Sequence, residues 1–582
     1  MKLNLDRLLF SARRYSLTLI SSFAGAIVAI AIVNVNEENF QNLCLVLAVL
    51  ALGLVLYLAI DLLHQGATAL SWPRYISHLI ATVVLGLYLW YLLSLDRVTF
   101  NIALQYVLFN IALHLLISFV LFIDPRKNDL EEFWQFNRSV FTRFLLSLFN
   151  SAILFTGFSI ALLLLKLLFK IEPTKYSYYY LFVIIAAIFN TWFFLSGIRA
   201  NPGEKPYSPG LWFFTRFIIA PLVLIYLFLL YIYAFNSLFT WRWPTLKSTY
   251  LLALFSMPGI LTVLLTYPLQ NTEKGRWAKI FNRIFFSALI PLSLLMLACI
   301  VKRVSHYGIT EMMYIAFVCG LWLAGISIYF LFYKKSSIKL IPMSLFLICF
   351  SISWGPWGVA SVARRSQLSI LENQLQKAGI LKFHQFVETV KVKDPTMKKE
   401  MAAKISFLFE RFGFEPFQPW FDKPLEDILN TAGATENETL LALKNKLGLE
   451  GKEMKEKAFN FSSNSRNRAL DIRGFDYLLP IEDSTESSSG KITLAFSFDE
   501  QAIVITKNHS IVTKISLENE LNDILKTSPP LTQYNTDHKR LHFQFKNPEF
   551  SARVQLTHIS GTLVDNQPKI KSIRGFILLK LN

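Results

Sequence analysis

Few polar side chains lie within the apolar stretches of this sequence, and those few are the first candidates for chemistry. Asn110 and His114 are one helical turn apart in one apolar stretch, and Arg216 lies in another. Charged side chains cost about 2.5–3.5 kcal/mol on insertion at the centre of a membrane helix, so each needs a partner or a role. We predict a candidate intramembrane polar site of Asn110, His114 and Arg216 for a proton or a polar substrate. The alternatives are an Asn–His pair satisfied by neighbouring helices and an arginine that anchors to lipid headgroups.

The polar C-terminal part of the chain offers weaker candidates. His538 and His542 are four residues apart beside Asp537, but His542 falls in an expected strand, so the pair would not share a helical face. The sequence has no phosphate-binding loop, no His-Glu-x-x-His, no Cys-x-x-Cys and no Gly-x-Ser-x-Gly. We therefore expect no catalytic residue, no metal site and no cofactor.

The elements that must position these side chains are membrane helices. Hydrophobic residues make up 53% of the 582 residues and charged residues only 17%, which excludes an ordinary soluble globular protein. A spanning helix needs roughly 20 mostly apolar residues. Eleven segments qualify, at approximately 15–33, 42–63, 75–94, 100–123, 143–169, 177–198, 211–236, 248–268, 284–301, 311–333 and 340–360. Charged or titratable residues near their ends, namely Asp61, His64, His78 and Lys166, are expected at the membrane interface.

The net charge of +18 reports orientation rather than a nucleic-acid partner. Before residue 364 there are 27 basic and 13 acidic residues, so most of the surplus belongs to the apolar part. Loops on the side of the N-terminus carry 18 Lys and Arg, and loops on the other side carry 7. Because cytoplasmic loops retain positive charge, we predict a cytoplasmic N-terminus and, after eleven spans, an extracytoplasmic C-terminal domain. If segment 340–360 is re-entrant or interfacial, that domain is cytoplasmic instead.

The C-terminal part has the composition of a soluble domain. Helices are predicted at 368–379, 396–412, 438–447 and 517–525, with a solvated linker at 452–468. Short strands are predicted at 475–481, 491–498, 502–506, 511–515, 541–545, 552–559 and 570–581. The expected fold class is an α-helical polytopic membrane domain with about eleven transmembrane helices, followed by an α+β soluble domain with an antiparallel sheet and helices packed on one side. We place the boundaries at 1–363 (membrane domain), 364–470 (helical membrane-proximal region) and 471–582 (β-rich subdomain).

The junction between the two parts carries the most distinctive residues. It reads Trp354-Gly355-Pro356-Trp357-Gly358-Val359-Ala360-Ser361-Val362-Ala363-Arg364-Arg365-Ser366-Gln367. Aromatic and proline residues at this position fit an interfacial anchor that sets the angle between domain and membrane. We predict a junction motif of Trp354, Gly355, Pro356, Trp357, Ser361, Ser366 and Gln367.

The junction resembles a bacterial multi-pass membrane family known as domain of unknown function 4153. Other segments are similar to the family as well, namely 14–19, 216–223, 231–233, 265–269, 404–408 and 474–477, whereas Tyr15 stands where the family often has proline. The family has no established activity. The resemblance therefore implies a protein of the bacterial inner membrane and assigns no catalytic residue.

These observations favour a non-enzymatic envelope protein that presents its C-terminal domain for interaction or sensing. Its expected partners are the lipid bilayer and an envelope protein, and no nucleic acid. The alternative is a transporter or a lipid-handling protein, supported by proline breaks at Pro221, Pro258 and Pro291 within expected spans. A membrane enzyme is least favoured, because Asp, Glu and His do not cluster at one membrane face.

Overall fold

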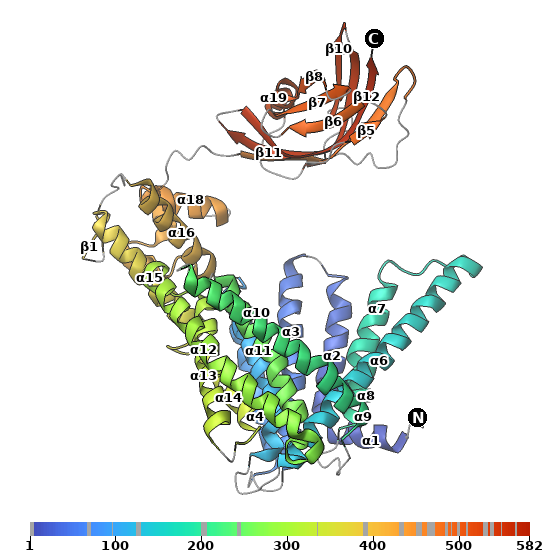
Figure 1. Cartoon of the computed structure of the whole chain (residues 1–582), viewed down its shortest axis with the longest axis vertical. Coiled ribbons are helices and arrows are strands. Elements are labelled where there is room, and N and C mark those ends of the chain that lie inside the picture. The colour runs from blue at the N-terminus through green and yellow to red at the C-terminus, as the bar shows by residue number, and fades with distance from the viewer. Residues whose placement is uncertain are drawn as a thin grey trace. The chain divides into compact units, whose positions relative to one another are not determined.

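The protein is described here by a computed structural model with two compact units, Met1–Lys446 and Leu447–Asn582 (Figure 1). The structure describes residues 5–581 apart from 36, 67–71, 96, 124–129, 199–206, 241–245, 334–335, 384, 388–393, 430–435, 450–456, 463–471, 483–486, 490–491, 498–500, 508–509, 528–533, 536–540, 549 and 565–566. The first unit is helical, and the second is rich in strands. The expected boundary at 363/364 falls inside one continuous helix, α15 (Val359–Lys377).

Most of the first unit consists of long apolar helices. In chain order they are α1 (Leu5–Arg14), α2 (Ser16–Ile32), α3 (Glu37–Leu63), α4 (Arg74–Leu93), α5 (Phe100–Phe119), α6 (Leu130–Phe169), α7 (Ser177–Val183), α8 (Asn190–Ser196), α9 (Pro209–Phe214), α10 (Ala220–Phe239), α11 (Leu246–Thr266), α12 (Arg276–Tyr307), α13 (Glu311–Phe332) and α14 (Leu340–Ser353). A π-helical segment joins α7 to α8 (Ile184–Phe189), and another joins α9 to α10 (Thr215–Ile219). A 3-10 turn, Val120–Phe122, extends α5.

Among the described residues, nine helices are long and apolar enough to cross a membrane. The other two expected spans correspond to shorter apolar helices, α2 with 17 residues and α14 with 14. The chain leaves helical geometry at Tyr15, which separates α2 from α1. It leaves it again at Trp354, and the next residue, Gly355, has a φ of +87°. Each of the eleven predicted spans thus corresponds to an apolar helix. Across the residues that the structure describes, nine of these helices reach membrane length and two are shorter.

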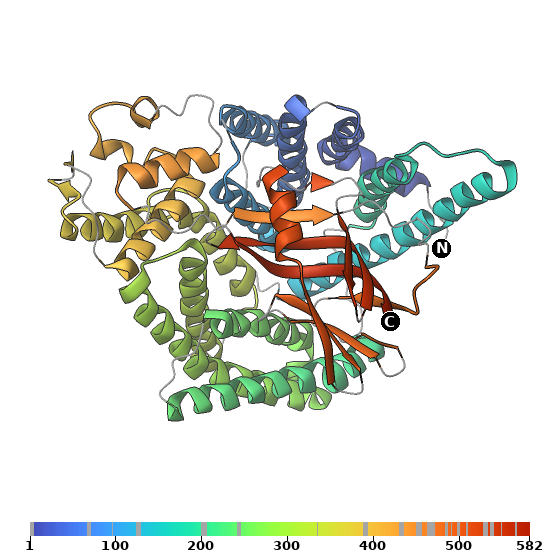
Figure 2. The ribbon, with the colours of Figure 1, turned by 90° about the horizontal axis from the view of Figure 1, so that it is seen from above.

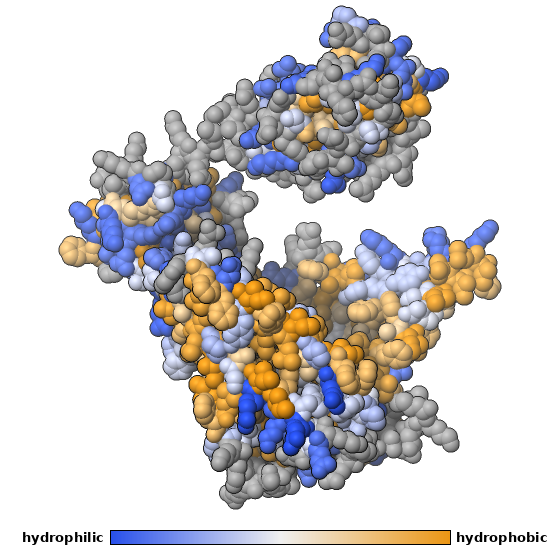
Figure 3. Space-filling model, viewed as in Figure 1, coloured by the Kyte–Doolittle hydropathy of each residue, from blue (hydrophilic) through white to orange (hydrophobic). Residues whose placement is uncertain are grey.

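The helices pack around shared apolar cores. One core lies among α10 to α14 and includes Phe285, Leu289 and Leu323; another includes Leu62 of α3 and Phe136 of α6. Seen from above, the early helices and the later helices form neighbouring groups (Figure 2). Many large apolar side chains remain exposed on the sides of the bundle, as Figure 3 shows, which is the surface that lipid tails require.

Helix α14 runs antiparallel along α5. At its start, the Lys339 ammonium donates to the carbonyl of Phe122, at the end of the 3-10 turn that follows α5. Further along, Phe346 packs on Phe119 and Phe350 packs on Phe109. The short helix therefore leads the chain from one end of α5 toward the other.

The helices after the junction pack with the bundle in the same compact unit, and we call residues 359–446 the platform. It contains α15, α16 (Pro395–Phe412), α17 (Leu425–Leu429) and α18 (Glu436–Lys446), with a small hairpin of β1 (Leu381–Lys382) and β2 (Gln385–Phe386). The Asp394 carboxylate caps α16 by accepting from the Thr396 amide at 2.9 Å, and α16 ends before Gly413, which has a φ of +66°. The predicted helices at 396–412 and 438–447 are confirmed to within two residues.

The second unit contains two sheets. Its strands are β3 (Lys457–Ser462), β4 (Tyr477–Ile481), β5 (Ser487–Ser489), β6 (Ile492–Ser497), β7 (Ala502–Lys507), β8 (Ser510–Ser516), β9 (Tyr534–Asn535), β10 (His542–Asn547), β11 (Phe550–Val564) and β12 (Gln567–Leu581), with α19 (Glu518–Thr527) after β8. The six-stranded sheet has the order β4-β12-β11-β3-β9, with β10 also paired to β11, and the four-stranded sheet has the order β5-β6-β7-β8. All of these pairs are antiparallel except β3 with β9.

The predicted α+β fold with antiparallel pairing is confirmed for this unit, whereas the linker predicted at 452–468 is wrong. The strands form two sheets, which share one core with α19. The expected linker 452–468 contains β3, which pairs with β11 and buries Phe461 in that core. Only alternate residues of a strand need to be apolar when one face is buried. The polar residues on either side of Phe461, Asn460 and Ser462, therefore make this segment resemble a solvated linker in the sequence.

Candidate functional site

The expected intramembrane site is divided between two helices. Asn110 and His114 lie on α5, and Arg216 lies in the π-helical segment between α9 and α10. His114 is exposed, and its ring nitrogen Nδ1 is 2.9 Å from the Asn110 carbonyl oxygen on α5. The Arg216 guanidinium is also exposed and stacks over the rings of Trp212 and Phe217 in its own segment. These contacts fit the satisfied and anchoring alternatives, and the structure records no contact that joins His114 to Arg216.

The junction motif serves two different purposes in the fold. Trp354 and Trp357 are exposed, and the Trp357 carbonyl accepts from the Tyr314 hydroxyl at 2.9 Å. Gly355 has positive φ and accepts from the Gly358 amide, so the four residues form a tight turn from α14 into α15. The Pro356 carbonyl accepts from the Arg365 guanidinium, nine residues further along the chain.

Ser366 and Gln367 hold the turn between α12 and α13. The buried Gln367 amide donates to the carbonyls of Tyr307 and Ile309 at 3.0 and 3.1 Å. The Ser366 hydroxyl accepts from the Ile309 amide at 2.9 Å. Backbone groups at helix ends lack partners within the helix, so these two side chains supply what the turn needs. The role of this part of the motif is to dock the platform on the bundle.

Gly308, in the same turn, should not tolerate a side chain. Its φ is +78°, and an added Cβ would lie 2.5 Å from Ile370 Cδ1 and 2.8 Å from Gln367 Nε2. We expect Gly308→Ala to destabilise the protein by about 1–3 kcal/mol through backbone strain and loss of this docking. The measurement is thermal unfolding in detergent. Gly86→Ala is the control, because no atom lies within 4 Å of its added Cβ; equal melting temperatures for the two variants would contradict the prediction.

A buried ion pair also joins the platform to the bundle. Arg411 of α16 lies with its Nε 2.9 Å from Oε1 of Glu311, which begins α13 and is only 2% exposed. The Arg411 guanidinium also stacks on Phe407 and Phe100. From the α4–α5 connection, Arg97 donates to the Phe409 carbonyl at 3.0 Å. Sequence reasoning missed this pair because its two members are far apart in the chain.

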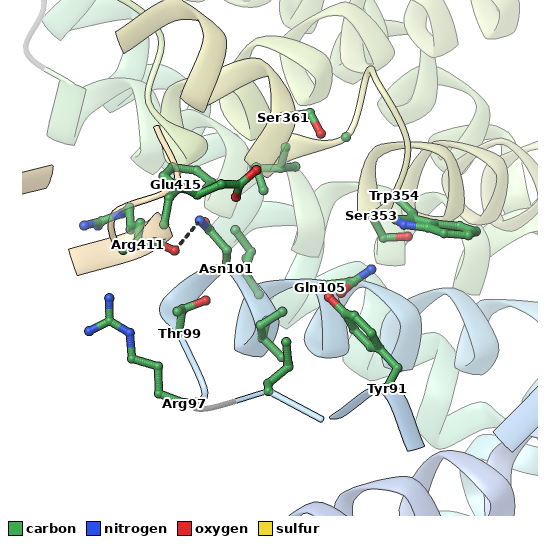
Figure 4. A pocket seen from close by; sticks show the side chains of 18 of the residues that line it. Tyr91, Arg97, Thr99, Asn101, Gln105, Ser353, Trp354, Ser361, Arg411 and Glu415 are labelled. Carbon is green, nitrogen blue, oxygen red and sulfur yellow. Dashed lines mark hydrogen bonds between the residues drawn. The ribbon is translucent and has the colours of Figure 1, made fainter. Parts of the chain in front are cut away.

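A cavity of about 910 Å³ lies where these elements meet (Figure 4). Its polar lining comes from the start of α5, the junction and the end of α16: Arg97, Thr99, Asn101, Gln105, Ser353, Ser361, Arg411 and Glu415. Its apolar lining includes Leu95, Ile102, Leu108 and Val359. The cavity thus combines hydrogen-bonding groups, the side chains of Arg97 and Arg411 and the carboxylate of Glu415 with apolar walls, and of the predicted motif it contains Trp354, Gly355 and Ser361.

A second buried polar cluster lies where α3 ends and α4 begins. The Asp61 side chain has no exposure, and its Oδ1 is 2.8 Å from Arg74 Nε and 2.9 Å from His78 Nε2. Arg74 also donates to the Arg14 carbonyl. The other carboxylate oxygen of Asp61 has no hydrogen-bond partner. The sequence predicts Asp61 at the membrane interface, but its side chain is buried in the bundle. Lys166 lies at an exposed helix end, where it pairs with Glu172.

Lys404 is a buried cation in the platform. Burial lowers the pKa of its ammonium group from the usual value, although the charge of Glu400 acts in the opposite direction. The folded state therefore disfavours the charged form of Lys404. The resulting destabilisation of the protein is fully present below the lowered pKa and disappears above the ordinary lysine pKa.

This shift gives a pH-dependent prediction. We expect Lys404→Met to melt at a higher temperature than the wild type at neutral pH, because the variant buries no charge. As the pH rises toward the ordinary lysine pKa of 10.5, folded wild type loses this proton and the advantage should shrink. The measurement is the difference in melting temperature at pH 7 and at alkaline pH, and a pH-independent difference would refute it.

The weaker candidates of the C-terminal part are largely outside the described residues. Asp537 and His538 lie there, whereas His542 is on β10 as expected. Within the described part of the chain, no group of three or more His, Cys, Asp and Glu is placed to hold a metal ion.

The fold defines a multi-pass membrane protein with a helical platform and a β-rich C-terminal unit. The chain belongs to the family described as a domain of unknown function (DUF4153), whose sequence model matches residues 22–376. This confirms the family predicted from the junction. The match begins within α2 and ends within α15, and the similar segments at 14–19, 404–408 and 474–477 lie outside it. No curated protein and no solved structure matches the chain.

Proposed function

We propose that this protein is a non-enzymatic protein of the bacterial inner membrane that presents its C-terminal unit outside the cytoplasm for interaction or sensing. The observation that carries the proposal is the division of the chain into two compact units, the second of which has a closed core of its own. The platform is fixed to the bundle by the Glu311–Arg411 ion pair and the Gln367 hydrogen bonds. A rigid base before an independent unit suits the presentation of that unit.

The proposed orientation rests on the basic loops together with the course of α14. If the side rich in Lys and Arg is cytoplasmic, α14 leads the chain away from that side along α5, and the platform follows outside. Reporters fused after Asn582 test this. We expect a periplasm-active enzyme to be active there and a protein that fluoresces only in the cytoplasm to stay dark. Fusions at residue 337, between α13 and α14, should give the reverse; fluorescence at Asn582 would overturn the orientation.

An interaction role is tested by photo-crosslinking the full chain in cells. Leu478 and Phe576 are apolar side chains of the C-terminal unit with 44% and 37% exposure, and Leu441 of the platform is a matched control with 38%. We expect a photoreactive residue at 478 or 576 to give one reproducible adduct with an envelope protein, and one at 441 to give none. If deletion of residues 447–582 leaves the cellular phenotype intact and no adduct forms, the proposal fails.

A further inference from the structure

The cavity beside the platform is built for a particular ligand chemistry. Two long helices begin at its wall: α5 follows the N-cap Thr99, and α15 follows the N-cap Gly358. The Thr99 side chain accepts no hydrogen bond from α5, and Gly358 has no side chain that could cap α15. The first helical bonds are Ala103 to Thr99 and Val362 to Gly358. The preceding amides of both first turns, together with the positive ends of the two helix dipoles, favour an anion.

Asn101 is an independent sign of a ligand. Its side chain is 93% buried, because only 7% is exposed, and it lines the cavity. Its Nδ2 donates to the Arg411 carbonyl at 3.4 Å, as Figure 4 shows. This donor contact fixes which amide atom is the nitrogen, so the remaining atom is the acceptor Oδ1. Oδ1 has no hydrogen-bond partner. A buried acceptor without a partner is rare, so a donor from outside the chain should satisfy it.

The surroundings of the cavity indicate an amphiphile. Leu95, Ile102 and Leu108 contribute apolar wall, and the cavity lies at the ends of two candidate spans, α4 and α5. Trp354 of its lining is exposed, as is Trp90 near the end of α4. Exposed tryptophans at the ends of membrane helices mark the depth of lipid headgroups.

We propose that this cavity binds a phospholipid whose headgroup carries a hydrogen-bond donor beside its phosphodiester. The phosphate lies at the first turns of α5 and α15, near the guanidinium group of Arg97. The charge of Arg411 is balanced by Glu311. The Glu415 carboxylate of the lining is paired with Arg364 at 2.8 Å. The donor, an ammonium or a hydroxyl, reaches Asn101 Oδ1. The acyl chains follow the apolar wall toward the exposed side of α4. This site is additional to the proposed presentation of the C-terminal unit and does not depend on it.

Lipid preference is the first test. The full chain is purified in detergent, stripped of lipid, and titrated with phosphatidylethanolamine, phosphatidylglycerol or phosphatidylcholine under native mass spectrometry. All three headgroups contain a phosphodiester, but only the first two carry a donor. We expect at least about tenfold tighter binding of those two than of phosphatidylcholine, because a buried acceptor left unpaired is costly. Equal binding of all three would overturn the assignment of the donor to Asn101.

Substitution of Thr99 separates binding from folding. Thr99→Asp and Thr99→Asn both provide a good N-cap for α5, so neither should lower the melting temperature. The aspartate adds a negative charge where the phosphate is proposed to lie, whereas the asparagine has nearly the same size without the charge. We therefore expect the aspartate variant to bind about tenfold or more weakly than the asparagine variant. Binding of phosphatidylethanolamine that is the same in both variants would overturn the proposal.

A competition experiment distinguishes a membrane phospholipid from a soluble phosphate ester with the same headgroup. Glycerophosphoethanolamine and glycerophosphoglycerol are phosphodiesters that have the headgroup without acyl chains. We expect neither, at millimolar concentration, to displace bound phosphatidylethanolamine, because the apolar wall then contributes nothing. Displacement by the soluble headgroups would overturn the lipid assignment.

Discussion

Arg74→Ala is expected to lower the stability of the membrane bundle by about 3–5 kcal/mol, one of the two largest effects that the structure predicts. Arg74 Nε lies 2.8 Å from Asp61 Oδ1, and the Asp61 side chain has no exposure. Removal of the guanidinium leaves a buried carboxylate that water cannot reach, with His78 Nε2 still 2.9 Å from its Oδ1. The carboxyl must then take up a proton or remain charged without its partner. The measurement is the temperature at which the purified protein loses its monodisperse peak.

Two further variants separate the loss of the Arg74–Asp61 attraction from the cost of leaving the Asp61 carboxylate charged and unpaired. Asp61→Asn in the Arg74→Ala background should recover much of the lost stability, because it removes the unpaired charge. Lys166→Ala is the matched control, since it breaks the 3.4 Å pair with Glu172 in which both side chains are exposed, and such pairs contribute about 0–1 kcal/mol. If Arg74→Ala melts like Lys166→Ala, the buried pair does not stabilise the bundle.

The helices and most strands could be predicted because each depends on local residue patterns. Twenty-residue apolar runs and the glycine after α16 are visible in the sequence, and β12 is visible as a run of β-branched and aliphatic residues. The strand β3 was missed because its core side chain, Phe461, is surrounded by polar residues and is buried only once β11 lies beside it. A local pattern cannot report a partner strand almost one hundred residues away.

The polar sites could not be predicted for a related reason. Asp61 lies at a helix end, where the sequence indicates a hydrated interface, but Arg74 and His78 of the next helix lie against its carboxylate. Arg74 in turn donates to the carbonyl of Arg14, at the end of α1. Asn101 has no distinguishing neighbours in the sequence, and only the docking of α16 covers it. The junction was recognised from its residue types, yet its division between docking through Gln367 and cavity lining through Ser361 depends on which helix face meets the bundle.

Arg411→Ala is expected to have the second large effect, about 3–5 kcal/mol, and to loosen the platform. Glu311 is 2% exposed, and Arg411 Nε at 2.9 Å is the cation that balances it. Without the arginine, the carboxylate gains stability only from its place in the first turn of α13, where the helix dipole contributes about 0.3–1 kcal/mol. Hydrogen exchange of α16 in the full chain should increase, because the segment that Arg411 holds against Phe100 loses its anchor.

Three further variants assign this effect to the charge rather than to the lost side chain. Arg411→Met keeps apolar contact with Phe407 but not the charge, so it should be destabilised nearly as much as the alanine variant. Adding Glu311→Gln to Arg411→Met should restore slow exchange in α16, because an amide in that place carries no charge to strand. Glu410→Ala, which removes the 3.8 Å partner on the exposed side, should leave exchange unchanged. If Arg411→Met exchanges like the wild type, the packing of the side chain and not its charge holds the platform to the bundle.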